Sequence, residues 1–73
     1  MNVVPVLRAI AETVLTAKAT GVVPRALDAA RLIHTRFPDC GLSPGEIATL
    51  FLEECIVQGV ASPEIQRRNG RRA

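Results

Sequence analysis

Apolar residues recur at alternating spacings of three and four over the first twenty positions of the chain. This period places them on one face of an α-helix. Pro5 suits the first helical turn, where a missing N–H costs nothing, and Gly21 suits the left-handed residue that ends a helix. The pattern predicts a helix over residues 5–19, with a core-facing side formed by Val3, Leu7, Ile10, Val14 and Ala17.

A second amphipathic pattern predicts a helix from Val23-Pro24 to Arg36. Pro38 ends it, because the residue before a proline is driven out of the helical region. Leu32 falls among the polar residues at about 100° per residue, so we expect it to be exposed. The predicted core-facing side consists of Val23, Ala26, Leu27, Ala30, Ile33 and Phe37.

The clearest local signal in the chain is the segment Ser43-Pro44-Gly45-Glu46. It has the form of a capping box, with Ser at the N-cap, Pro at the first helical position and Glu three residues after the Ser. A third helix is therefore predicted from Ser43 to Gln58, with Gly59 as its stop. Its polar strip is narrow, so we expect it to be buried on nearly all sides and to form the centre of the fold. That strip consists of Glu46, Thr49 and Glu53.

Ser62-Pro63-Glu64 carries similar cap chemistry and predicts a short fourth helix over residues 63–68. Asn69-Gly70 would break it, and residues 71–73 are expected to be disordered. The fold class is therefore all-α, a small bundle of three to four helices in which a helix-turn-helix-like arrangement is an option. Residues 1–64 are predicted to form one helical domain, and residues 65–73 a basic, disordered tail.

The composition fits one small domain. The chain has 73 residues, of which 48% are hydrophobic, and it contains neither Tyr nor Trp. No apolar run reaches the roughly 18 residues that a membrane-spanning helix requires, and no signal peptide is visible, so we expect a cytoplasmic protein without a membrane partner. Two cysteines, Cys40 and Cys55, do not form a disulfide framework, and free thiols are the favoured interpretation over a single bridge.

Charge is distributed unevenly. Residues 1–64 contain five basic and seven acidic side chains, a net charge of −2. The remaining nine residues add four positive charges, so the overall charge of +2 comes entirely from the tail. These tail arginines are candidate contacts to nucleic-acid phosphates, with a solubilising tail as the alternative interpretation. They are Arg67, Arg68, Arg71 and Arg72.

Candidate catalytic residues are few. His34 is the single histidine, and it is interpreted as a half-buried structural residue because a general base also needs a pocket and an orienting partner. The spacing of His34 and Cys40 does not favour a nucleophile pair. Adjacent Glu53 and Glu54 point in different directions on a helix and are interpreted as a solvated edge. We therefore predict that the protein is not an enzyme and holds no cofactor and no metal.

Residues 41–51, Gly-Leu-Ser-Pro-Gly-Glu-Ile-Ala-Thr-Leu-Phe, resemble the entry to a helix-turn-helix unit of the LuxR type. The resemblance implies that Glu46, Ile47 and Ala48 lie on a positioning helix. The chain departs from the family pattern after residue 51, because Leu52–Gln58 continue as apolar helix where a turn should follow. In an extended-turn variant the third helix would read DNA, but it carries three acids and no basic residue, so DNA would repel it.

The function predicted best is a small regulatory module that binds and modulates a larger protein, which could itself bind DNA. Surplus apolar surface on a small domain marks a partner site, and an acidic body suits a basic partner. One alternative is an accessory DNA-binding protein that uses the arginine tail, and another is a scaffolding homodimer. The candidate partner-binding residues are Leu32, Leu52, Ile56, Glu53 and Glu54.

Overall fold

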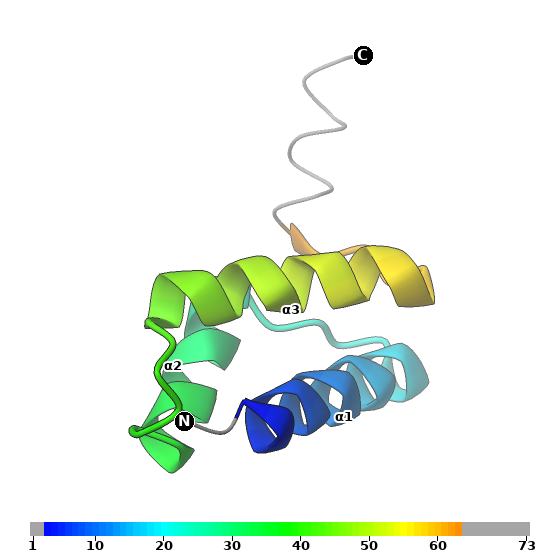
Figure 1. Cartoon of the computed structure of the whole chain (residues 1–73). Coiled ribbons are helices and arrows are strands. Elements are labelled where there is room, and N and C mark those ends of the chain that lie inside the picture. Colours follow the sequence, from blue (N-terminus) through cyan, green and yellow to red (C-terminus); the bar gives the residue numbers. More distant parts are fainter. Residues whose placement is uncertain (1–2, 64–73) are drawn as a thin grey trace.

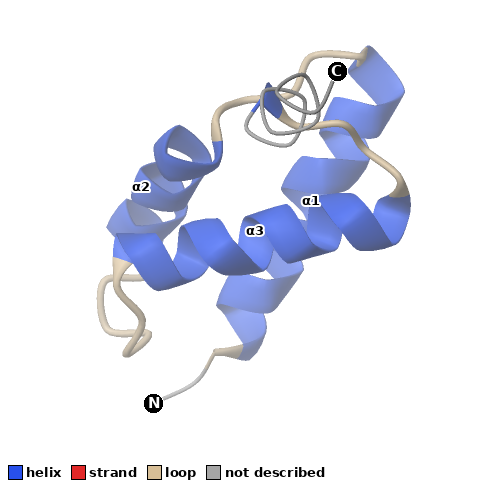
Figure 2. Ribbon diagram, turned by 90° about the horizontal axis from the view of Figure 1, so that it is seen from above, coloured by secondary structure: helices blue, strands red, loops and turns tan. Residues whose placement is uncertain are grey.

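Three helices make up most of residues 3–63, the part of the chain that the computed structural model describes. They are α1 (Val4–Thr20), α2 (Ala26–Arg36) and α3 (Pro44–Gln58). Helix α3 lies across the other two, which pack on the same side of it and more on α3 than on each other (Figure 1, Figure 2). No strand occurs in this part of the chain, so the predicted all-α class is confirmed for it.

The predicted fourth helix and the tail fall largely outside the described residues. Pro63 is the last described residue and has helical conformation. The rest of the predicted helix, the domain boundary at residue 64, and the four tail arginines lie beyond it.

Helix α1 has the predicted ends and a different buried face. Gly21 adopts the left-handed conformation with φ of 77°, and its N–H donates to the Ala17 carbonyl at 2.8 Å. Val3 and Leu7, which were predicted to be core residues, are instead 37% and 45% exposed. Because α1 packs against both α2 and α3, its buried side is displaced from the predicted face toward small residues, which allow the helices to approach one another closely. The buried residues are Val6, Ala9, Ile10, Val14 and Ala17.

Helix α2 begins later than predicted, at Ala26. Arg25, the residue before it, is extended with ψ of 142°, so Pro24 lies in the connecting loop and not in the first turn. Leu27 was predicted to face the core but is 44% exposed, and Ala29 is buried in its place. The predicted exposure of Leu32 is confirmed, at 70%.

Helix α3 starts and stops as its local chemistry predicts. The Ser43 N–H donates to Glu46 Oε1 at 2.9 Å, and Ser43 Oγ accepts from the Glu46 N–H at 3.2 Å, which completes the capping box. The Ser43 backbone N–H that donates to the Glu46 carboxylate, and after it the Ser43 side chain, hold the pKa of Glu46 below its usual value. The charged form therefore stabilises the fold at neutral pH, and this contribution is lost as the pH falls through the lowered pKa. Gly59, with φ of 72°, ends the helix.

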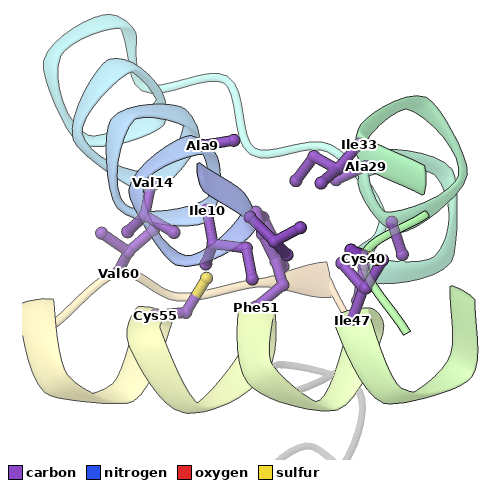
Figure 3. Close-up of a cluster of buried hydrophobic side chains, with 13 residues drawn as sticks. Ala9, Ile10, Val14, Ala29, Ile33, Cys40, Ile47, Phe51, Cys55 and Val60 are labelled. Carbon is purple, nitrogen blue, oxygen red and sulfur yellow. The ribbon is translucent and has the colours of Figure 1, made fainter. Parts of the chain in front are cut away.

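One stripe of α3 holds the core together. Ile47, Phe51 and Cys55 are fully buried and point toward α1 and α2 (Figure 3). The expectation that α3 is buried on nearly all sides is wrong, because Ile56 and Val57 are 67% and 78% exposed. Helices α1 and α2 approach α3 from one side only, so they cannot cover its full circumference.

Replacing Phe51 with Ala should lower the free energy of unfolding by about 3–5 kcal/mol, because it removes a fully buried ring and leaves a cavity. For a domain of this size that is a large part of its total stability. Thermal denaturation followed by circular dichroism measures the loss. The exposed Val57→Ala is the control and should change stability by about 0.5 kcal/mol or less. Similar melting temperatures for the Phe51 variant and the parent protein would mean that Phe51 is not in the core.

Ser43→Ala should cost about 1 kcal/mol, because the N–H of Glu46 loses the hydroxyl that caps it. Urea denaturation at neutral pH provides the measurement. Thr49→Ala is a matched control, since the Thr49 hydroxyl makes an exposed 3.2 Å bond to the Gly45 carbonyl within the same helix but caps nothing. An unchanged midpoint for the Ser43 variant would show that the capping box does not form in solution.

Candidate functional site

The five candidate partner-binding residues lie at three places on the surface. At about 100° per residue, Leu52 and Ile56 stand roughly 100° and 140° around α3 from buried Phe51. On the other side of Phe51, Glu54 stands roughly 60° around the helix and Glu53 roughly 160°. Leu32 is on α2 and lines a different depression from the one that Glu53 and Glu54 share. The structure therefore does not bring the five together, but it gives two of them a shared setting.

That setting is a shallow groove of about 280 Å³ between α1 and α3. We call it the α1–α3 groove. Helix α1 supplies Leu7 and Ile10, and α3 supplies the other four lining residues: Leu50, Glu53, Glu54 and Val57. Both helices continue past the groove, so its two walls are fixed by the same packing that buries Ile10 and Phe51.

The groove combines apolar walls with negative charge. Leu7 is 45% exposed and Val57 78%, while Leu50 is partly buried against the core. Glu53 is exposed, and half-buried Glu54 accepts a hydrogen bond at Oε2 from Gln58 Nε2 at 2.6 Å. Among the residues that the structure describes, no basic side chain lines the groove. An apolar strip beside two carboxylates is suited to a ligand that is both apolar and cationic.

Further apolar side chains follow Leu7 along α1. Ala11 and Leu15 follow Leu7 at intervals of four residues, so the three lie in one row along the helix. Ala11 is half-buried and Leu15 is 54% exposed. The row spans about 12 Å at 1.5 Å per residue, and Leu50 to Val57 span about 10 Å on α3.

A second depression surrounds Leu32. It has a volume of about 430 Å³, and its lining includes Thr13 of α1, Pro24 of the loop and Ile33 of α2. We call it the α2 hollow. Both Asp28 and Arg36 line it, so it has no single charge. Its walls are mainly apolar, which keeps Leu32 a candidate contact for a partner.

The residues considered for catalysis include His34 and the two cysteines. His34 is half-buried, as predicted. Both cysteines are buried and neither forms a disulfide, and Cys40 Sγ bonds with the backbone of Leu42, accepting from its N–H at 3.4 Å. Among residues 3–63 no three His, Cys, Asp or Glu side chains are grouped so that they could hold a metal ion.

Leu7, Leu50 and Val57 are the site residues that the sequence analysis missed. Leu7 was assigned to the core, and Leu50 and Val57 to a helix buried on nearly all sides. A usable signal was present: both α1 and α3 carry more apolar positions than one helix face can bury. On a small domain some of that surplus must remain exposed.

No family model, curated protein or solved structure matches this chain. None of the helices in the described part is long and apolar enough to cross a membrane.

Proposed function

We propose that this protein is a small helical protein-interaction module that acts by binding a larger, basic protein and thereby regulating it. The observation that carries the proposal is the α1–α3 groove, where exposed Leu7 and Val57 line the same depression as Glu53 and Glu54, and no basic side chain of residues 3–63 lines it. Scattered exposed apolar residues are ordinary on a protein surface, whereas a contiguous set marks a contact. Here the set is contiguous across two helices.

The α2 hollow is the second candidate contact surface. Leu32 is 70% exposed beside mainly apolar walls, which favours insertion of a partner side chain there. Its mixed charge selects less sharply among partners than the acidic groove does. Leu52 and Ile56, on the far flank of α3, would enlarge a contact only for a partner that wraps around that helix.

DNA binding remains the principal alternative function. Helices α2 and α3, joined by residues 37–43, form the part that a helix-turn-helix-like interpretation would use. Helix α3 carries Glu46, Glu53 and Glu54 and no basic residue, which disfavours contact with phosphates. DNA binding would therefore depend on Arg67, Arg68, Arg71 and Arg72.

Val57→Glu should weaken binding to the natural partner by about tenfold or more, because a charge placed in an apolar contact must be desolvated. The measurement is affinity capture from the native host with quantitative mass spectrometry, which compares the variant with the parent chain. Leu32→Glu tests the α2 hollow in the same way, since both side chains are at least 70% exposed and neither change should disturb folding. Val22→Glu is the matched control, because Val22 is 72% exposed and lies in the loop between α1 and α2, outside the lining of both surfaces. Leu32→Glu should leave capture by the α1–α3 groove intact.

The outcomes separate the candidates. Loss of capture with Leu32→Glu alone would assign the contact to the α2 hollow. If neither Val57→Glu nor Leu32→Glu changes which proteins are captured, the result would count against a specific interaction module. Light scattering of the purified chain tests the scaffolding homodimer.

A chain that ends after Glu64 should retain its protein partner, and the full chain should bind duplex DNA weakly at physiological salt. Titration of labelled duplex at several salt concentrations measures the second point. If the full chain binds tightly, with a steep salt dependence that truncation abolishes, the arginine tail is the functional site and the DNA-binding alternative replaces the proposal.

A further inference from the structure

We propose that the α1–α3 groove is the docking site for a cationic amphipathic helix of the partner protein. This inference rests on the proposed function and specifies its site and the chemistry of the ligand. It is carried by two properties of the groove: the length of its α3 wall and its charge.

The α3 wall of the groove is about two helical turns long. Leu50 to Val57 on α3 span about 10 Å, and an α-helix that places apolar residues at positions i, i+3 or i+4, and i+7 also spans about 10 Å between the first and last of them. Leu7 and Ile10 of α1, which crosses α3, provide the other wall (Figure 2). The α3 wall can therefore face the apolar stripe of a short helix over about two turns.

The charge of the groove selects a cationic helix. Glu53 is exposed beside the apolar walls, and half-buried Glu54, whose Oε2 accepts from Gln58 Nε2, lines the same groove. Lys or Arg side chains that flank the apolar stripe of a ligand helix would pair with these carboxylates. An acidic helix would be repelled at the same positions.

The same charges disfavour a second copy of this chain as the occupant. A two-fold symmetric dimer through this groove presents the same patch from both subunits. Glu53 and Glu54 of one copy would then approach the acidic patch of the other, and the described residues supply no basic side chain to the lining to compensate them. Burial of like charges without a partner is costly.

The test uses three synthetic 18-residue peptides and the full 73-residue chain. The first peptide has Leu at helix positions i, i+3, i+7 and their repeats, with Arg on the flanks. The second keeps the Leu residues and replaces Arg with Glu, and the third keeps Arg and replaces Leu with Ser. Binding is measured by calorimetry and located by amide chemical-shift changes in NMR spectra.

The Leu/Arg peptide should bind and shift the amides of Leu7, Leu50 and Val57. Both control peptides should bind at least about tenfold more weakly, since each lacks one of the two recognition elements. Leu7→Asp should weaken the Leu/Arg peptide by a similar factor. Leu27→Asp is the matched control, because Leu27 on α2 is 44% exposed and Leu7 is 45% exposed, and it should leave affinity unchanged.

Glu53→Lys keeps the test decisive if Leu7→Asp affects folding, because Glu53 is exposed. This variant should weaken the Leu/Arg peptide and strengthen the Leu/Glu peptide. Equal affinity for the two Leu-containing peptides, shifts confined to α2, or absence of binding would each overturn the inference. Concentration-dependent dimerisation with shifts in the groove would assign it to a second copy instead.

Failure of the inference can be told apart from failure of the proposed function. If partner capture depends on Val57 but the Leu/Arg peptide does not bind, the interaction module stands and the cationic helix is excluded as its ligand. If the peptide binds in the groove but Val57→Glu changes the capture of no host protein, the proposed regulatory function is wrong.

Discussion

The insertion of one narrow stripe of α3 between α1 and α2 is the interaction on which this structure depends. Helices α1 and α2 make most of their contacts with α3 and few with each other, so neither is held in place without it. Phe51 is the largest side chain of the stripe and is fully buried. The capping box at Ser43 and the left-handed Gly59 set where α3 begins and ends, and therefore which of its turns reach the other two helices.

The packing of α1 and α2 on one side of α3 also creates the exposed surface. Because its partners lie on one side, α3 buries only part of an apolar circumference and leaves Leu50 and Val57 beside Leu7 of α1. A further structural element placed over the groove would be needed to cover these residues. The α1–α3 groove is thus a direct result of building a core from three short helices, and its carboxylates distinguish it from a simple packing defect. A partner helix in that position would supply the missing element and gain affinity from the apolar area it covers.

Much of this fold was predictable from local signals. Helix α3 has the predicted bounds because the capping interactions of Ser43, Glu46 and Gly59 involve only residues a few positions away in the sequence. The exposure of Leu32 followed from the helical period alone. The buried face of α1 was not predictable in this way, because the helix offers two overlapping apolar faces. Whether Leu7 or Val6 is buried depends on where α2 and α3 dock, and the exposure of Val57 depends on the same long-range geometry. The groove combines these two residues, so it could be recognised only after the helices had been placed.

The central claim is that the α1–α3 groove is open to solvent in the full chain. It is tested most directly by NMR measurement of methyl relaxation in the presence of a neutral paramagnetic cosolute. We expect strong relaxation enhancement at the methyl groups of Leu7 and Val57, and little at those of Ile47 and Val14, which are fully buried. Protection of Leu7 and Val57 to the level of Ile47 would contradict the account, because it would mean that another part of the chain or a second copy already covers the groove.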